Sequence, residues 1–485
     1  MRLMIAGGGG FRVPLVYRAL CAGPFAGLVR ELVLYDVDRG RLGAIEAVLR
    51  DMPGPAAGRP AVVVSSELPE ALAGTDMVFA AIRPGGTAGR VADERVALDL
   101  GLLGQETTGA GGISYALRSI PPMLELARAM REHCPDAWLI NFTNPAGMVT
   151  EALVPVLGRR VIGICDSASG LVQRAAKAAG VPLAEGVLDG VGYVGLNHLG
   201  WLYRLQVAGK DVLPGLLADD ARLATFEEGR LFGGALLERL GCLPNEYLYY
   251  YYETARATAA IRAMGETRGA SIHAQQAALY PRLAGASGEE GVPGSGGVPD
   301  GGTQGGGPAY RLWDAARRSR EEGYLAEARG LGEERDEEDL AGGGYERVAL
   351  AVMRALAGRG TAQLILNTPN SPVAVRREGD KAGEAEVAVP GLPGDAVVEV
   401  PCVVTPDGAL PLPQSRPAGQ FLTLMRRVKD VERLTIRAAG SGDREAALQA
   451  FAGHPLIGSQ KLAGRLLTGY EAAFPALPGL WRDTA

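Results

Sequence analysis

The chain has 485 residues, of which 47% are hydrophobic and 21% are charged, a balance that is ordinary for a soluble globular protein. The formal net charge of −6 argues against nucleic acid or an anionic membrane as the main partner. The five cysteines are odd in number and lack CxxC spacing, and no signal peptide or membrane-spanning run is seen, so we expect a cytoplasmic protein without disulfides.

The first part of the chain alternates short apolar runs with helical segments. Residues 2–6 predict a strand that ends in four glycines, and residues 13–21 predict the helix that follows. The segment ELVLYDVD predicts a second strand ending at Asp36, and AVVVSS, DMVFAAI, WLINFTNPAG and RRVIGIC continue the pattern. This alternation predicts parallel βαβ units, so the expected fold class is α/β, a Rossmann-like doubly wound sheet.

The character of the chain changes between residues 166 and 190. From about Val191 the expected strands alternate apolar and polar residues more clearly, and residues 247–252 form a tyrosine-rich helical stretch. We therefore expect a nucleotide-binding domain over residues 1–190 and an appended α+β domain over residues 191–485.

Part of the second half is of low complexity. Residues 285–310 are rich in glycine and have too few apolar side chains to offset the entropy of ordering, so we expect a disordered insertion there. The charged residues 317–339 predict a solvated helix or tail of this insertion. An amphipathic helix is predicted at GGGYERVALAVMRALAG, and helices are again expected over residues 422–470.

The glycine turn after the first strand predicts a dinucleotide site. Gly7, Gly9 and Gly10 allow close approach of a diphosphate to the backbone and to the free N–H groups of the next helix. Arg12 stands where the third glycine of GxGxxG is expected. The carboxylate of Asp36 can bind a ribose diol and would repel a 2′-phosphate, which favours NAD over NADP. The alternative is a glycine-rich turn that binds no nucleotide.

A second pair of residues indicates a metal site. Cys165 and His198 are both expected at strand ends, where ligands of open α/β sheets gather, and a thiolate with an imidazole can hold a divalent metal. Taken separately, a buried cysteine and a hydrogen-bonded structural histidine are the commoner explanations. The segment NEYLYYYYE adds five tyrosines, and helix packing explains most of them. One tyrosine beside a cation could act as a base, but the pattern does not tell which.

Taken together, these segments resemble glycoside hydrolase family 4, and within it most of all the 6-phospho-β-glucosidases. The resemblance runs nearly end to end, apart from residues 285–339, and is carried by GGGG..VP, IRPGG, DERVALDLGLLGQETTGAGG, DAWLINFTNPAG, ICD, GLNHLGW, PNEYLYYYY, GETRG, NTPN and DAVVEVPCVV. It implies a fold like that of lactate and malate dehydrogenases. It also implies a catalytic second domain and a homo-oligomer, because members commonly form dimers or tetramers.

The resemblance implies hydrolysis by redox and elimination, an exception to the usual two-carboxylate mechanism. NAD takes hydride from C3 of the sugar, a base removes the acidified C2 proton, the aglycone leaves C1, water adds, and C3 is reduced again. A divalent metal, usually Mn²⁺, polarises the C3 oxygen. The positions that match the family are the metal ligands Cys165 and His198, the base Tyr247, the proton donor Asp166, the substrate-binding residues Arg90, Asn144 and Arg268, and the cofactor-binding residues Gly7, Gly9, Gly10, Asp36 and Asn141.

The chain departs from the family at the glycine turn. Gly10 and Val13 replace two hydroxyl residues that lie near the cofactor or sugar phosphate, which puts the phosphorylated substrate in question. Three alternatives therefore stay open beside a 6-phospho-β-glucosidase. They are a family 4 enzyme for an α-linked or unphosphorylated glycoside, a 2-hydroxy acid dehydrogenase, and a sugar-nucleotide-binding protein without catalysis. Without the family, surface ion pairing would be the preferred explanation for Arg90 and Arg268.

Overall fold

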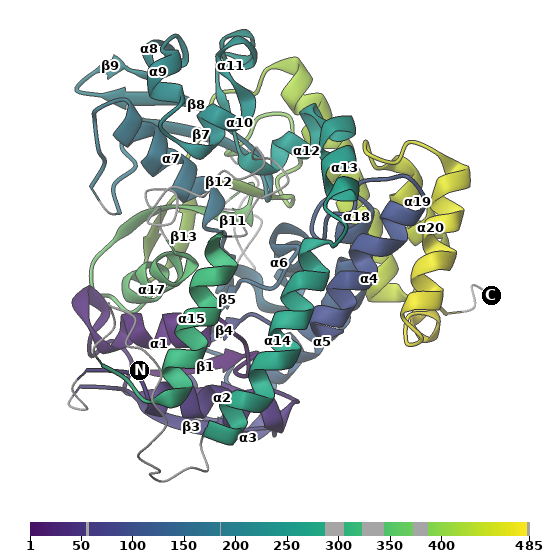
Figure 1. The fold of residues 1–485 in the computed structure, drawn as a ribbon. Coiled ribbons are helices and arrows are strands. Elements are labelled where there is room, and N and C mark those ends of the chain that lie inside the picture. Colours follow the sequence, from purple (N-terminus) through teal and green to yellow (C-terminus); the bar gives the residue numbers. More distant parts are fainter. Residues whose placement is uncertain (55–57, 185, 287–304, 323–343, 372–386, 483–485) are drawn as a thin grey trace, which may run out of the picture.

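The protein is described here from a computed structural model that covers residues 1–54, 58–184, 186–286, 305–322, 344–371 and 387–482. Within these residues one mixed thirteen-stranded sheet runs through the molecule in the order β10-β8-β7-β12-β11-β6-β5-β4-β1-β2-β3 (Figure 1). β13 pairs with β12, and β9 pairs with β8, beside this path. Helices cover both faces of the sheet (Figure 1).

The first six strands are parallel, and their order, β3-β2-β1-β4-β5-β6, is that of a doubly wound nucleotide-binding fold. The strands are β1 (Arg2–Ala6), β2 (Glu31–Tyr35), β3 (Ala61–Ser65), β4 (Met77–Ala80), β5 (Trp138–Asn141) and β6 (Val161–Gly163). Their helices are α1 (Val13–Cys21), α2 (Arg39–Arg50), α3 (Leu68–Leu72), α4 (Gly86–Asp99), α5 (Ala110–His133), α6 (Ala146–Leu157) and α7 (Ser167–Ala178). The expected α/β fold class is confirmed.

The remaining strands extend the sheet in antiparallel fashion, with β11 paired to β6 and β7 paired to β12. They are β7 (Val191–Leu196), β8 (Leu199–Val207), β9 (Lys210–Asp211), β10 (Leu243–Pro244), β11 (Ala362–Pro369), β12 (Val397–Thr405) and β13 (Gly408–Pro411). Between them lie the short helices α8 (Leu213–Leu217), α9 (Asp220–Leu223), α10 (Glu227–Phe232), α11 (Gly234–Leu240), α12 (Tyr249–Tyr252) and α13 (Thr254–Ala263). The sheet therefore continues across residue 190.

The longer helices after residue 260 return to the nucleotide-binding half. They are α14 (Arg268–Ala286), α15 (Pro308–Glu322), α17 (Tyr345–Leu356), α18 (Gly419–Ser441), α19 (Arg444–Gly453) and α20 (Gln460–Ala473). α14 and α15 lie side by side against α2, while α18 and α20 pack on α5 and α4 (Figure 1). This second segment therefore covers the first instead of standing beside it.

The alternating side chains of β1 show how the sheet separates two cores. Leu3 and Ile5 belong to the core on one face, and Met4 and Ala6 belong to the core on the other, all at most 1% exposed. Burial on both faces explains why the parallel strands appear in the sequence as unbroken apolar runs. The helix after the turn begins at Val13, as predicted. Pro14 fits in its first turn because the N–H groups there have no partner within the helix.

Three expectations about the chain as a whole can be compared with the described residues. All five cysteines are free thiols. No described helix is long and apolar enough to cross a membrane. Of the insertion expected to be disordered, residues 287–304 lie outside the described residues, but its last part is ordered, because α15 begins at Pro308 and both Ala309 and Tyr310 are buried.

Candidate active site

A cavity of about 1190 Å³ lies at the carboxyl ends of the parallel strands. Ala6, the last residue of β1, lines the cavity. So do the residues that directly follow β2, β4, β5 and β6, namely Asp36, Ala81, Phe142 and Ile164. Ligands of open α/β sheets bind at this edge, because the strand order reverses there and leaves a crevice. The loops before β8, helices α14 and α15, and the start of α17 complete the wall.

The glycine turn forms the cofactor end of this cavity. Gly7 has φ of +92°, and a Cβ at this position would lie 2.7 Å from the carbonyl oxygen of Ala81. The N–H of Gly9 donates to Asp36 Oδ2 at 3.1 Å, and both Asp36 and Gly10 line the cavity. No side chain caps the start of α1, so the helix N-terminus remains available to an anion. The turn and Asp36 thus fit a dinucleotide.

Asn141 lies behind this wall, outside the lining of the cavity. Its side chain is fully buried, and its Nδ2 donates to the oxygens of Thr143, Ala146 and Thr150 at 3.1–3.3 Å. Its Oδ1 accepts the N–H of Thr143 at 2.9 Å. These bonds shape the loop that carries Asn144, which does line the cavity and precedes a cis proline. Asn141 therefore supports the site from behind the lining.

Cys165 and His198 lie in the same cavity although they come from different elements. Cys165 follows β6 by two residues, and His198 occupies the two-residue turn between β7 and β8 with φ of +61°. A left-handed histidine costs free energy, and such residues gather at functional sites. Among the described residues, no group of three or more His, Cys, Asp or Glu side chains could hold a metal. Cys165 and His198 could supply two ligands to a metal, and substrate or water could supply others.

The tautomer of His198 follows from its neighbours. The single hydroxyl hydrogen of Thr107 is donated to Gln105 Oε1 at 3.1 Å, and the same Thr107 Oγ1 lies 3.1 Å from His198 Nδ1. Thr107 is then the acceptor, so Nδ1 carries the ring hydrogen and Nε2 keeps a lone pair. Burial lowers the pKa of His198 to about 3, so the ring is neutral. A neutral imidazole held by an outer hydrogen bond is a suitable metal ligand.

Burial acts on the thiol in the opposite sense. It raises the pKa of Cys165 well above the usual value, and the nearby Glu399 and Asp166 raise it further. A metal bound here would have to displace the thiol proton, which makes its binding dependent on pH. Asp166, the next residue, lines the same cavity and is the N-cap residue of α7.

Tyr247 is distinguished from the other tyrosines of its segment by its contact with His198. The two rings are stacked, with centroids 3.7 Å apart and planes inclined by 3°. Tyr247 and Tyr250 line the cavity, whereas Tyr252 accepts the indole N–H of Trp201 at 2.9 Å outside it. If His198 holds a metal, Tyr247 is the tyrosine whose hydroxyl that metal could acidify.

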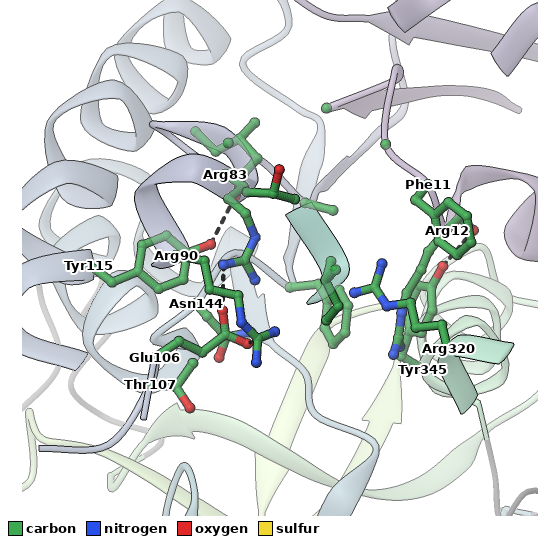
Figure 2. A pocket seen from close by; sticks show the side chains of 18 of the residues that line it. Phe11, Arg12, Arg83, Arg90, Glu106, Thr107, Tyr115, Asn144, Arg320 and Tyr345 are labelled. Carbon is green, nitrogen blue, oxygen red and sulfur yellow. Dashed lines mark hydrogen bonds and ion pairs between the residues drawn. The ribbon is translucent and has the colours of Figure 1, made fainter. Parts of the chain in front are cut away.

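Arginines gather around Glu106, the residue before Thr107. Arg83 and Arg90 both pair with Glu106, at 2.5 Å and 2.7 Å, and Arg90 Nε also contacts Glu94 at 2.9 Å. Figure 2 shows Arg83, Arg90, Glu106 and Asn144 together on one side of the cavity. Burial alone would raise the pKa of Glu106, but Arg83 and Arg90 outweigh it and hold the pKa at about 2. Arg90 is thus a buried ion-paired residue, and the surface pairing considered for it is wrong.

Several residues of the cavity were not identified from the sequence as site residues. Arg268 was identified from the sequence, and it lies at the start of α14 and lines the cavity. Arg83, Glu106 and Thr107 lie in IRPGG and GQETTG, two blocks that carry the resemblance, so a signal was present. Arg320 lies in the charged run that we expected to be solvated, and it lines the cavity beside Phe11, Arg12 and Tyr345 (Figure 2).

Comparison with protein families covers both halves of the chain. Residues 2–181 match the Family 4 glycosyl hydrolase domain, and residues 193–457 match the Family 4 glycosyl hydrolase C-terminal domain. The 6-phospho-beta-glucosidase of Escherichia coli K12 is 26% identical over 461 residues, which are 92% of this chain and 90% of that protein. The maltose-6'-phosphate glucosidase of Bacillus subtilis is 36% identical, but over 222 residues, 44% of this chain and 48% of that protein.

The solved structures agree with these matches. The 6-phospho-beta glucosidase from Thermotoga maritima, solved with manganese, NAD⁺ and glucose-6-phosphate, superimposes with a TM-score of 0.74 at 25% identity and with 98% of each chain covered. The ligands of that structure are the cofactor, metal and phosphorylated sugar that the sequence of the present chain predicts. The relatives include enzymes named for both β- and α-linked substrates.

Proposed function

Because the chain belongs to glycosyl hydrolase family 4, we propose that it hydrolyses 6-phospho-β-glucosides with NAD and a divalent metal, by preference manganese. One observation carries the proposal. A single cavity joins a dinucleotide turn, the pair Cys165 and His198, the stacked Tyr247 and a cluster of arginines. A 2-hydroxy acid dehydrogenase would have no use for Cys165, His198 or Tyr247. A binding protein without catalysis would not need these three residues, the turn and the arginines in one cavity.

The geometry of the cavity suggests which residues would hold NAD and the metal. Gly7, Gly9 and Gly10 with the start of α1 would hold the diphosphate of NAD, and Asp36 would bind its ribose. Cys165 Sγ and His198 Nε2 would hold the metal. When bound, NAD supplies a hydride acceptor for C3 of the sugar, and the metal supplies a Lewis acid for its oxygen.

The side chains around the sugar have separate tasks. Tyr247 takes the proton from C2, because its ring is fixed against His198 and its hydroxyl is next to the proposed metal ligand. Asp166 gives a proton to the departing oxygen, and it sits beside Cys165 in the same lining. Arg90, Arg268 and Asn144 bind the sugar and its phosphate, since a planar guanidinium can bond two phosphate oxygens at once.

The test is hydrolysis of p-nitrophenyl 6-phospho-β-glucoside by the full chain under reducing conditions. NAD⁺ and Mn²⁺ are each present or omitted, and the α-anomer and the unphosphorylated β-glucoside are measured alongside. We expect turnover of the phosphorylated β-anomer that requires both additions. Turnover of the α-anomer alone would correct the linkage, and turnover of the plain sugar alone would show that Gly10 and Val13 mark a changed substrate. No turnover of any of them would refute the proposal.

A further inference from the structure

The helix α15 is a part of the cavity wall that contains none of the sequence blocks on which the family resemblance was based. It is nevertheless firmly packed. Trp313 is fully buried, and its indole N–H donates to the carbonyl oxygen of Phe11 at 2.7 Å. At the start of the helix, the N–H of Ala309 donates to Asp51 Oδ2 at 2.8 Å. The helix is therefore tied to the glycine turn and to the end of α2.

This anchoring determines where the arginines of α15 lie. Arg317 and Arg320 follow Trp313 by four and seven residues, which places all three on one face of the helix. Both arginines line the cavity. Arg317 is paired with Asp314 at 2.9 Å, whereas Arg320 lies over the ring of Phe11 with its guanidinium carbon 5.1 Å from the ring centroid. Arg320 Nε is buried and has no hydrogen-bond partner among the described residues.

Arg320 enters a region that is already positive. Burial lowers its pKa well below the usual range, and Arg12, Arg90 and Arg268 lower it further. Arg12 lies over the ring of Tyr345, 5.3 Å from its centroid, and Figure 2 shows Arg12 and Arg320 together on that side of the cavity. Buried like charges oppose one another. Glu106 and Glu346 line the same cavity and offset part of this repulsion, and a bound anion would offset more of it.

We propose that helix α15 supplies Arg320, with Arg12 on the same side of the cavity, as a binding site for the phosphoryl group of the sugar substrate. The inference rests on the proposed function and adds its specificity. Gly10 and Val13, which flank Phe11 and Arg12, line the same cavity and have no side-chain donor for a phosphate. A dianionic phosphate monoester matches two neighbouring guanidinium groups in charge.

The experiment is calorimetric titration of the NAD-saturated full chain with glucose 6-phosphate, alongside titration of the protein with NAD⁺ alone. Arg320→Gln removes the charge, Arg320→Lys keeps it without the planar fork, and Arg318→Gln is the matched control on the same helix, because Arg318 is 54% exposed and outside the cavity lining. We expect Arg320→Gln to weaken binding of glucose 6-phosphate at least about tenfold. Arg320→Lys should fall between, and Arg318→Gln and NAD⁺ affinity should stay within about twofold.

The alternatives give different results. Weakened NAD⁺ binding with unchanged glucose 6-phosphate binding would mean that Arg320 serves the diphosphate of the cofactor and would overturn the inference, as would unchanged binding of both. If Arg320→Gln fails to fold, unchanged binding by Arg320→Lys has the same meaning. If the proposed function is wrong, the unsubstituted protein will hydrolyse no 6-phosphoglucoside. Loss of glucose 6-phosphate binding in Arg320→Gln would in that case still support the anion site.

Discussion

Two adjoining groups of buried side chains line the cavity, yet burial has opposite consequences for their charges. In the first, which we call the neutral end, burial favours the neutral forms of Cys165 and His198, as shown by the raised pKa of the thiol and the pKa of about 3 of the imidazole. In the second, which we call the arginine end, Glu106 keeps its charge because Arg83 and Arg90 flank it. The two adjoin because Thr107, the residue after Glu106, contacts His198.

The neutral end needs a cation brought from outside before it can do chemistry. Glu246, next to Tyr247, also follows this trend, since burial and the neighbouring Glu228 raise its pKa to about 8. A bound metal would favour the thiolate of Cys165 and a more acidic hydroxyl on Tyr247. The arginine end is already charged, and its guanidinium groups are paired with Glu106 and Glu94. The predictions below probe this division, beginning with the largest effect.

Replacing Tyr247 with Phe tests whether the neutral end carries the proton transfer. The ring can still stack on His198, but the hydroxyl is gone, so we expect kcat to fall roughly 10²–10⁴-fold and exchange of the C2 proton with solvent to slow with it. Exchange is measured by NMR in D₂O, with Tyr251→Phe as the control from the same tyrosine run outside the main cavity. A normal exchange rate would assign the base elsewhere.

Replacing Cys165 with Ser tests whether the neutral end depends on a metal. A serine hydroxyl is a poor ligand at neutral pH, so Mn²⁺ binding should be lost and turnover should fall more than about a hundredfold, beyond the effect of losing an outer partner. NAD⁺ affinity should be retained, because the glycine turn is untouched. Mn²⁺ binding is followed by electron paramagnetic resonance, and Cys21→Ser is the control for a thiol outside the cavity. Unchanged Mn²⁺ affinity would remove Cys165 from the site.

The comparison also shows which parts of the site can be predicted from sequence. The glycine turn, α1 and Asp36 are local features, because adjacent residues form a strand, a turn and a helix, and each lies where the pattern predicts. Cys165 and His198 line one cavity because β11, β12 and β7 extend the parallel sheet beyond β6, which no local pattern reveals. The family resemblance provided that link.

Arg320 shows where sequence patterns were misleading. Its surroundings, residues 317–339, are strongly charged and follow a glycine-rich segment, and such composition is usually typical of solvated chain. Only a short pattern indicates a packed helix here. Tyr310 and Trp313 are aromatic, are spaced three residues apart, and are buried in the structure. Conversely, Asn141 has the amide of a binding residue, but its hydrogen bonds within the protein leave it behind the lining.

A smaller effect is expected from Thr107, which orients His198 without touching a ligand. Thr107→Val removes the oxygen that accepts the Nδ1 hydrogen, so the imidazole loses its preferred tautomer, and we expect Mn²⁺ affinity to fall about 10–100-fold. Thr108→Val is the control at the next position, since Thr108 is buried and the hydrogen bond to His198 comes from Thr107. Equal Mn²⁺ affinity in the two variants would show that the hydrogen bond does not tune the metal site.

The smallest effect concerns His454, which resembles His198 in burial but lies outside the main cavity. Its Nδ1 accepts the N–H of Leu456 at 3.1 Å, and burial, aided by Arg427, lowers its pKa to about 3. Between that value and the usual 6.5, the unfolded chain binds a proton that the folded chain does not, so stability falls as the pH falls.

His454→Asn should keep an acceptor without this proton uptake. As the pH falls from about 6 to about 4, the unsubstituted protein should lose stability that the variant keeps. The free energy of unfolding of His454→Asn minus that of the unsubstituted protein should therefore rise by about 1.4 kcal/mol for each pH unit. The measurement is denaturant unfolding at several pH values without added metal. Mn²⁺ should leave the difference between the two proteins unchanged, because His454 is no ligand. Parallel curves for the two proteins would show that His454 is protonated when folded, and a metal-dependent difference would link it to the neutral end of the cavity.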